Sequence, residues 1–374
     1  MIFIICSFHG LFAQTEKEEN KRLSFEGDIR LRIEHDWDSM RSDGSKRNDR
    51  SRLRYRIRLG STFKLDKYSS FSTRLRTANI NNQQDPHHTI GGQDGEFELG
   101  RIGFEKIFYQ YQNKGLTAWM GKNSIPLKKL NELFWNDNVF PEGIALKYKF
   151  GFQKDQLIDK LSLNAGHFIV RANGQGFRAD SYLQVFQIET DLLDKRLSLF
   201  PSYYYFRDIG DLPDGFASST LDYNIFHLGS TFTLLKKPKL VLGLEYYNNF
   251  TDYTDVPAVA DDFKEENQAF VIFVKLGETK TKGDWSVKLT YAHIEKNAVV
   301  DYFAQNDWVR WNYSGVGSNA SRLTNFRGFD LRISYAIKEK YILNLRAFSV
   351  EQILPFGIEK EDGNRVRLDL DVKF

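Results

Sequence analysis

The sequence contains a single cysteine, seven histidines and no long apolar run. The cysteine, Cys6, lies in a short apolar segment at the N-terminus, so the rest of the chain has neither disulfide bonds nor thiol chemistry. No stretch of about 18 consecutive apolar residues occurs, which excludes a membrane-spanning helix. The formal net charge is only +3, so any electrostatic preference depends on where the charges are placed.

Motifs for catalysis and metal binding are also scarce. No serine stands at a recognisable hydrolase spacing from the histidines of the mature chain, which are His35, His87, His88, His167, His227 and His293. The pair His87-His88 is compatible with a surface metal ion or a cation that bridges lipopolysaccharide. The acidic stretch 261–266 is compatible with Ca²⁺, although a solvated loop explains each stretch more simply. We therefore predict that the protein is not an enzyme and uses no metal and no cofactor.

Aromatic residues, in contrast, are abundant. They make up 15% of the chain, with 31 Phe and 18 Tyr, although the mean hydropathy is −0.48. This combination is typical of a β-barrel wall that has one face in lipid and the other face in water, with aromatic residues at the two membrane interfaces.

The N-terminal segment Met1–Ala13 is a short apolar run that ends in a small residue, which is typical of a secretory signal peptide. It lacks a basic region at its start, as a truncated signal would. Residues 14–22 are charged and are expected to be flexible. Residues 23–374 show no linker and no internal repeat, so we predict one domain there.

The stretch Arg52–Phe63 indicates the type of structure most clearly. Its residues alternate strictly between apolar and basic side chains, which is the period of a β-strand. One face carries Leu53, Tyr55, Ile57, Leu59 and Phe63, and the other carries Arg52, Arg54, Arg56 and Arg58. In a transmembrane barrel the apolar face contacts lipid and the arginines face the lumen, whereas in a soluble sandwich the arginines face bulk water.

About sixteen such segments follow one another, each long enough to cross a bilayer at a tilt. They are Leu23–Glu34, Arg52–Phe63, Ser69–Ala78, Glu105–Gln112, Leu116–Lys122, Gly143–Phe150, Lys160–Arg171, Leu183–Asp191, Leu197–Phe206, Asn224–Leu234, Pro238–Asn248, Gln268–Gly277, Asp284–Glu295, Phe326–Ile337, Tyr341–Gln352 and Asn364–Phe374. The fold class predicted is therefore all-β, a transmembrane antiparallel β-barrel of about 16 strands, with a range of about 14–18.

Long and short connections alternate along the chain, beginning with His35–Ser51 and Lys64–Tyr68. Short periplasmic turns and long extracellular loops are the organisation of a bacterial outer-membrane barrel, and an even strand number places both termini in the periplasm. The last strand ends in Phe374 on its apolar face, which resembles the signal read by the barrel assembly machinery. We predict a Gram-negative outer-membrane location, in contact with lipid and lipopolysaccharide.

Closure of a barrel makes the first and last strands neighbours, and this gathers basic residues from both ends of the chain on one arc of the lumen. The predicted solute pathway consists of Arg30, Arg32, Arg52, Arg54, Arg56, Arg58, Arg74, Arg76, Arg332, Arg346, Arg365 and Arg367. Arginine stays charged and offers a planar donor fork to carboxylates. The same arc carries Glu26, Asp28, Asp330, Asp369 and Asp371, so the arginines could instead form a lattice that only stiffens the wall. Arg54, Arg56, Arg74 and Arg76 are expected to lie farthest from these carboxylates.

The third long connection, Asn123–Glu142, is unusually apolar, and we expect it to enter the lumen, with a short helix. Its predicted constriction residues are Lys128, Lys129, Glu132 and Trp135. Packing across the mouth of the barrel or against a neighbouring subunit is the alternative.

Residues 115–127, GLTAWMGKNSIPL, and 134–150, FWNDNVFPEGIALKYKF, resemble the strand–loop–strand unit of alginate-export-type porins. In that family a Gly-Arg pair ends one strand and an aromatic-x-Gly unit opens the next. Gly121 matches, Lys122 replaces the arginine, and Phe140 and Gly143 correspond with one extra residue between them. The resemblance implies an outer-membrane barrel that conducts anionic polysaccharide or other solutes, and phosphate-selective porins are a near neighbour.

These observations together predict a passive outer-membrane porin. Its solutes would be small or anionic, such as uronates or oligosaccharides, and would pass an Arg-lined lumen narrowed by the third loop. Nucleic acid is excluded as a partner because the arginines would lie inside the barrel, and a homo-oligomer is compatible with the pattern. The alternative is a surface-exposed structural or adhesion barrel with a plugged pore.

Overall fold

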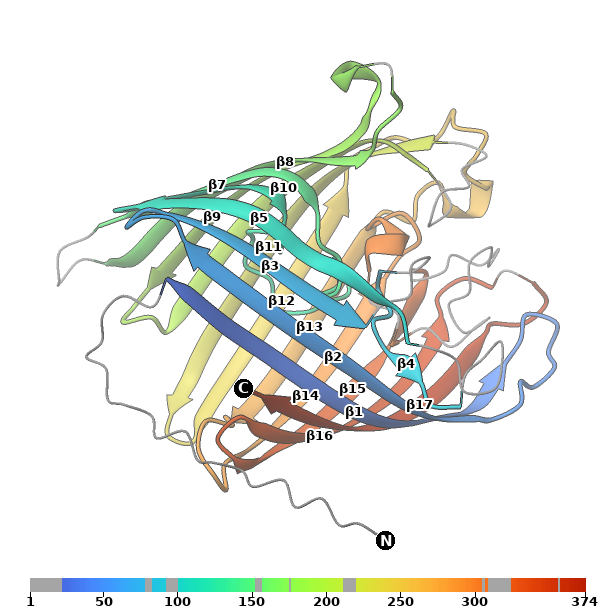
Figure 1. Cartoon of the computed structure of the whole chain (residues 1–374). Helices are drawn as coiled ribbons and strands as arrows, with labels where there is room; N and C mark the ends of the chain where they lie inside the picture. Colours follow the sequence, from blue (N-terminus) through green and yellow to red (C-terminus); the bar gives the residue numbers. More distant parts are fainter. Residues whose placement is uncertain are drawn as a thin grey trace, which may run out of the picture.

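The strands of this protein form one closed antiparallel sheet (Figure 1). The structure is a computed structural model, and it describes residues 22–77, 83–91, 100–151, 157–174, 176–210, 220–304, 307–308, 324–355 and 357–374. The predicted signal peptide therefore lies outside the described residues, as does nearly all of the segment 14–22. No helix in the described chain is long and apolar enough to cross a membrane.

All sixteen predicted strands are present, most of them a few residues longer than expected. They are β1 (Leu23–Met40), β2 (Arg50–Lys64), β3 (Ser69–Thr77), β5 (Ile102–Asn113), β6 (Leu116–Lys122), β7 (Glu142–Phe150), β8 (Ile158–Arg171), β9 (Ser181–Leu192), β10 (Leu197–Gly210), β11 (Thr220–Lys236), β12 (Lys239–Asn249), β13 (Gln268–Gly277), β14 (Trp285–Ile294), β15 (Phe326–Lys338), β16 (Tyr341–Gln352) and β17 (Asp362–Lys373). The described parts of the connections contain three short 3₁₀ turns, at Phe177–Ala179, Asp261–Phe263 and Asp301–Phe303.

A further strand, β4 (His88–Thr89), has no counterpart among the predicted segments. It pairs with Arg54 and Tyr55 of β2, beyond the point where β3 ends at Thr77. Two residues are too few to show alternation, so the sequence offered no signal for this strand.

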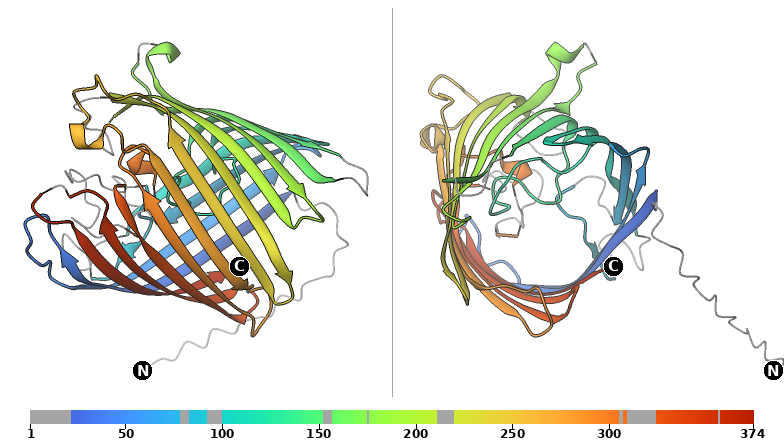
Figure 2. Two further views of the ribbon diagram at one scale, coloured as in Figure 1. Left: turned by 180° about the vertical axis from the view of Figure 1, so that it is seen from behind. Right: turned by 90° about the vertical axis from the view of Figure 1, so that its left-hand side faces the viewer.

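The barrel closes where β1 pairs with β17 on one side and with β2 on the other. Both pairings are antiparallel, and the remaining strands pair with their neighbours in the chain, except that β3 pairs with β5 and β4 pairs with β2. Closure leaves no unpaired edge, which is the condition for a sheet to lie in lipid, because each backbone N–H and C=O needs a partner there. The strands surround an interior that is crossed by chain segments (Figure 2).

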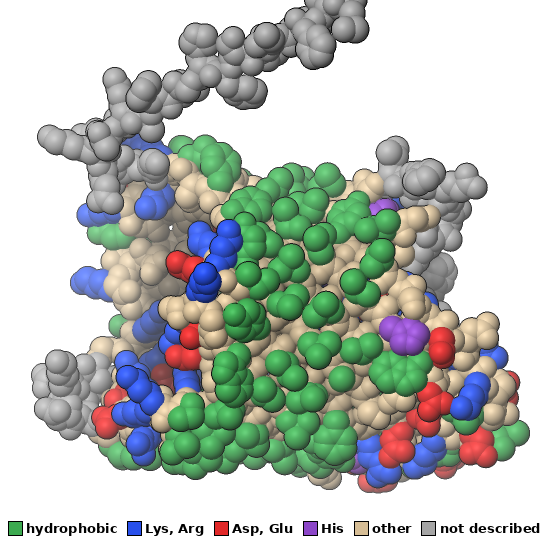
Figure 3. Space-filling model, turned by 90° about the horizontal axis from the view of Figure 1, so that it is seen from below, with side chains coloured by type: hydrophobic (Ala, Val, Ile, Leu, Met, Phe, Trp, Pro, Cys, Tyr) green, Lys and Arg blue, Asp and Glu red, His purple; other side chains and the backbone are tan. Residues whose placement is uncertain are grey.

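Alternation along the strands gives the wall an apolar outer face and, on several strands, a charged inner face. On β2, Leu53 and Leu59 are 51% and 53% exposed, whereas Arg54 and Arg56 are each 6% exposed. Apolar side chains cover most of the outer face seen in Figure 3. A large exposed apolar band of this kind is the surface that a lipid bilayer covers.

The inner faces of β9 to β13 depart from this rule, because they carry many apolar side chains beside a few buried polar ones such as Gln187 and Glu245. Leu183, Tyr247, Val271 and Phe273 point inward and are at most 7% exposed. They belong to a core cluster that includes residues of the connections, among them Trp135, Phe263, Val299 and Phe303. The interior therefore has two halves, one filled by apolar side chains and one lined by charges.

The long and short connections are at opposite ends of the barrel, in the predicted alternation. The longest described connections follow β3, β6, β12 and β14, and the shortest are residues 114–115, 237–238 and 339–340. β1 starts and β17 ends at the end with short turns, so residues 23 and 374 lie at the same rim.

The seam between the two ends of the chain depends on a glycine. Gly27 and Phe374 exchange two backbone hydrogen bonds of 3.1 Å and 3.0 Å, and the Phe374 ring occupies the place of a side chain at residue 27. We predict that Gly27→Val destabilises the refolded barrel by about 1–3 kcal/mol, because the added atoms overlap the ring and the Arg58 carbonyl. Urea unfolding in lipid vesicles measures this change.

The control is a double-mutant cycle with Phe374→Ala, refolded without assembly factors. The second substitution removes the ring, so it should recover part of the lost stability. Additive effects of the two substitutions would show that the ring and residue 27 do not interact.

Candidate functional site

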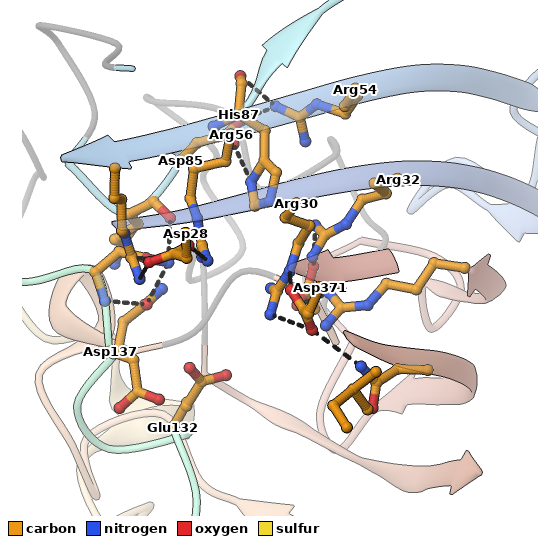
Figure 4. A pocket seen from close by; sticks show the side chains of 18 of the residues that line it. Asp28, Arg30, Arg32, Arg54, Arg56, Asp85, His87, Glu132, Asp137 and Asp371 are labelled. Carbon is orange, nitrogen blue, oxygen red and sulfur yellow. Dashed lines mark hydrogen bonds and ion pairs between the residues drawn. The ribbon is translucent and has the colours of Figure 1, made fainter. Parts of the chain in front are cut away.

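The charged half of the interior contains a cavity of about 800 Å³. It lies along the inner face of β1, β2, β3 and β17, and loop 3 (residues 123–141) bounds it on the other side. Its basic lining residues are Arg30, Arg32, Arg50, Arg52, Arg54, Arg56, Arg58, Arg74, Arg365, Arg367 and Lys373. Its acidic lining residues are Glu26, Asp28, Asp85, Glu132, Asp137, Asp307 and Asp371. Figure 4 shows ten of the lining side chains with labels.

Strand register brings these side chains together. Arg30 of β1 lies opposite Arg56 of β2 and Asp371 of β17, and Arg32 lies opposite Arg54 and Asp369. Because the side-chain period of a strand is two, every second residue of these three strands faces the lumen. The predicted arc of basic residues from both ends of the chain is therefore present as a geometric feature.

Four of the predicted arginines form bidentate ion pairs with carboxylates of neighbouring strands. Arg30 donates to Asp371 at 2.5 Å and 3.0 Å, and Arg32 donates to Asp369 at 2.6 Å and 3.2 Å. The other two pairs are Arg346 with Asp330, at 2.6 Å and 3.0 Å, and Arg365 with Asp36, at 2.6 Å and 3.0 Å. This part of the arc is a lattice of fork-to-fork pairs that holds the seam together.

The prediction that Arg54, Arg56, Arg74 and Arg76 lie farthest from the five carboxylates of the arc is wrong for Arg56, and the other three pair with carboxylates that the prediction did not consider. Arg54 contacts Asp85 at 2.5 Å, and Arg56 contacts Asp28 at 2.5 Å. Arg74 and Arg76 both pair with Glu105 at the start of β5, the latter at 3.3 Å. The sequence does not reveal these ion pairs, because Asp85 comes from a connection and the carboxylate of Glu105 pairs with arginines of both β2 and β3.

The remaining predicted arginines differ in which carboxylates, if any, neutralise their charge. Arg52 pairs with Glu34, and Arg58 lies 3.0 Å from Glu105 and donates to Asn138 of loop 3 at 2.7 Å. Arg367 pairs with Asp307 and with Asp369 at 3.2 Å. Arg332 forms no ion pair with a described carboxylate.

Asp307 was not predicted, yet it lies at the centre of the arginine cluster. It is 8% exposed, and it contacts Arg365 at 3.2 Å, Arg32 at 3.8 Å and Arg346 at 3.9 Å, besides its pair with Arg367. Burial opposes its ionisation, but the surrounding guanidinium charges outweigh this effect and hold the pKa of Asp307 well below its usual value. It comes from the long connection between β14 and β15, where sequence patterning carries no information on contacts.

Loop 3 enters the lumen, as predicted, but the short helix predicted there is wrong. The backbone N–H groups of Lys128 and Leu130 donate to Gln187 and Glu245 of the barrel wall, at 2.8 Å and 3.0 Å. Gln187 and Glu245 thus accept hydrogen bonds from backbone N–H groups that, in a helix, would be donated to backbone carbonyls of the preceding turn. Loop 3 is therefore held in an irregular conformation by the strands around it.

The apolar residues of loop 3 anchor it in the filled half of the interior. Leu133, Phe134 and Trp135 are at most 5% exposed. The Phe134 ring stacks on Tyr247 with a centroid separation of 5.1 Å, and the Trp135 ring stacks on Phe303 at 4.7 Å. Trp135 thus belongs to the packed core and does not face the main cavity.

Of the charged residues of loop 3, Glu132 and Asp137 line the cavity, whereas Lys128 and Lys129 do not. Lys128 is 3.5 Å from Asp191 and 3.7 Å from Glu189, and Lys129 pairs with Asp137. Burial opposes ionisation of Glu132, but the Lys129 charge and a hydrogen bond with Asp137 lower the pKa of Glu132 to about 2. Partial desolvation and the Glu132 charge raise the pKa of Asp137.

The side chains of His87, His88 and Asp261, considered above for metal binding, contact other side chains of the protein. His87 has a side chain only 5% exposed, with Nδ1 3.5 Å from Asp85, and burial together with the Arg32 charge holds its pKa well below the usual value. His88 lies against the Tyr55 ring. Asp261 forms an ion pair of 2.8 Å with Lys264.

Comparison with solved structures shows the same fold. Pseudomonas putida OprB, described at high pH, has 12% identity and a TM-score of 0.55, with 95% of this chain and 94% of that chain covered. Two mutants of the Rhodopseudomonas blastica porin have 12% and 10% identity and TM-scores of 0.53 and 0.52, with 93% of this chain and 99% of theirs covered. No curated protein sequence is significantly similar.

A family model gives the stronger evidence. The model described as "Putative porin" matches residues 40–214 and 214–374. The narrower resemblance to alginate-export-type porins is not tested by this match and stays a prediction. Because the matches span well over half of its length, the chain belongs to this putative porin family and is a passive channel of the outer membrane.

Proposed function

We propose that this channel favours anions, including carboxylate solutes such as uronates, and conducts them along the cavity beside β1, β2, β3 and β17. The observation that carries this proposal is the composition of the cavity wall, with ten arginines and one lysine against seven carboxylates. A low-dielectric wall focuses such an excess of positive charge and raises the local concentration of anions. The guanidinium fork also matches the geometry of a carboxylate.

Loop 3 would narrow this pathway. Its residues Glu132, Asn136, Asp137 and Asn138 line the cavity opposite the arginines of β1 and β2. A solute therefore meets basic groups on the wall and acidic groups on the loop. This arrangement orients a polar solute across the pore as well as selecting its charge.

The orientation of the barrel follows from its connections. We infer that the short turns and both termini face the periplasm, and that the long connections face outward, toward lipopolysaccharide. The terminal Phe374, paired with Gly27, would be the signal that the assembly machinery reads. The outer apolar face leaves room for a homo-oligomer.

The competing function is a structural or adhesion barrel whose pore is closed. The apolar half of the interior favours it, because loop 3 and other connections fill that half. Single-channel recording in planar bilayers separates the two functions. A conducting porin gives discrete ion-permeable steps, and a barrel without such steps would be structural.

The first prediction concerns the arginines of β2. Arg54→Gln combined with Arg56→Gln removes two charges from the wall. At a distance of about 10 Å in water each charge contributes about 0.4 kcal/mol, with opposite signs for anions and cations. Anion permeability should therefore fall about fourfold and cation permeability should rise about fourfold, so their ratio should fall about 16-fold. Reversal potentials in a KCl gradient measure this ratio.

Arg327→Gln is the matched control, since Arg327 is 44% exposed in its side chain and pairs with Glu351 at 2.5 Å. It should leave the reversal potential unchanged. Equal effects of the control and the double variant would contradict a role for the cavity wall.

The second prediction concerns the acidic pair of loop 3. Because the pKa of Asp137 is raised and that of Glu132 is lowered, Asp137 takes up a proton first as the pH falls. The loop then loses one negative charge, which favours anions and disfavours cations by about twofold each, so the anion-over-cation ratio should rise about fourfold on acidification. Asp137→Asn should show the higher ratio already at neutral pH and lose most of the pH response.

Asp261→Asn, in an exposed connection, is the control for this experiment and should titrate like the unmodified channel. A pH response of undiminished size in Asp137→Asn would assign the titration to other carboxyls.

A further inference from the structure

A row of basic residues crosses four adjacent strands of the barrel. Lys275 of β13 lies opposite Lys288 of β14, Lys288 lies opposite Arg332 of β15, and Arg332 lies opposite Arg346 of β16. Like charges directly opposite each other destabilise a sheet. Such a row needs carboxylate partners, or else a bound anion, to offset the repulsion.

Carboxylate partners are found for only one end of the row. Arg346 binds Asp330 through two hydrogen bonds. Lys288 Nζ donates to the Leu130 carbonyl at 3.3 Å and lies 4.0 Å from the centroid of the Phe273 ring. Neither Lys288 nor Arg332 forms an ion pair with a carboxylate in the part of the chain that is described, and Arg332 Nε is buried without a hydrogen-bond partner. This contrasts with the arginines of β1 and β2, nearly all of which are paired.

A second cavity, of about 350 Å³, lies at this place between loop 3 and strands β14 to β17. Lys288 and Arg332 line it, and Leu130 and Asn131 of loop 3 bound it. It shares several residues with the main cavity, among them Arg30, Glu132 and Arg367. The two cavities are therefore adjacent, on either side of the charged part of loop 3.

Five described carboxylates line the second cavity, and four of them are engaged by other cations, including Asp137 by Lys129. Asp330 is bound by Arg346, Asp369 by Arg32, and Asp371 by Arg30 and Asn344. These four offset the charges of their own partners. Glu132, the fifth, forms no ion pair among the described residues and offsets only part of the charge of Lys288 and Arg332. The lining consequently has six basic residues against five carboxylates, and Lys288 and Arg332 are its two cations without an ion pair among the described residues.

We propose that Lys288 and Arg332 form an oxyanion-binding subsite, which holds a phosphate, sulfate or carboxylate group next to the constriction. Arg332 would donate from the terminal nitrogens of its guanidinium group, and Lys288 would donate from Nζ. The subsite rests on the proposed anion preference of the channel, but it adds a binding step that an excess of wall charge alone does not require.

The test uses inorganic phosphate as a blocker of chloride current in planar bilayers at constant KCl. In the unmodified channel, phosphate should reduce the chloride conductance in a saturable manner. Lys288→Gln combined with Arg332→Gln should raise the half-blocking phosphate concentration about tenfold or more, since each residue supplies a hydrogen bond from a charged donor. Lys288→Gln alone should raise the half-blocking phosphate concentration by less. This single variant replaces the double variant in the test if the double variant does not fold.

Lys147→Gln is the matched control. Lys147 is an inward lysine of β7 that is neutralised by Glu189 at 3.1 Å, so its loss removes the same charge from a paired position. It should leave phosphate block unchanged. Repeating the titration with sulfate and with galacturonate distinguishes a general oxyanion subsite from one that prefers phosphate or carboxylate.

The outcomes separate this proposal from the anion preference itself. Reversal potentials in a KCl gradient report the preference, and phosphate block reports the subsite. An anion-selective channel without saturable phosphate block, or one whose block is unchanged in Lys288→Gln with Arg332→Gln, would overturn the subsite and leave the proposed function standing. A channel with no anion selectivity would overturn the proposed function.

Discussion

Closure of β1 onto β17 is the constraint on which the rest of this structure depends. In lipid, an open sheet edge would leave backbone N–H and C=O groups without partners, and each would cost several kcal/mol. Pairing the two ends of the chain removes that edge. It also places Arg30 and Arg32 beside Asp371 and Asp369, although these residues are more than 300 positions apart in sequence. The charged cavity exists only because the ring is closed.

Charge balance inside the barrel explains why stiffness and selectivity are not competing interpretations of the arginines. Bidentate pairs such as Arg346 with Asp330 hold neighbouring strands at a fixed separation. Because Asp307 and Glu105 each serve several arginines, the lining retains an excess of positive charge after these pairs have formed. The same side chains can therefore reinforce the wall and set the potential of the lumen.

Loop 3 divides the interior because its two sides have different chemistry. Phe134 and Trp135 pack into the apolar half, where they remove aromatic surface from water. Glu132 and Asp137, a few residues away, face the cavity. The apolar anchor holds the acidic pair at a defined position opposite the arginine wall. An irregular loop without such packing would not maintain a constriction.

The sequence by itself determined the strands, their order and their inner and outer faces, because a period of two is written directly into segments such as Arg52–Phe63. It also determined which arginines would gather once the barrel closed. The tertiary structure decided which of them are compensated, since the carboxylates of Asp85, Glu105 and Asp307 come from connections or from shared positions that periodicity does not reveal. It likewise decided that β9 to β13 face an apolar interior, that loop 3 forms no helix, and that Lys288 and Arg332 lack acidic partners within the described chain. Each of these outcomes depends on contacts between residues far apart in sequence, and local patterns carry no record of such contacts.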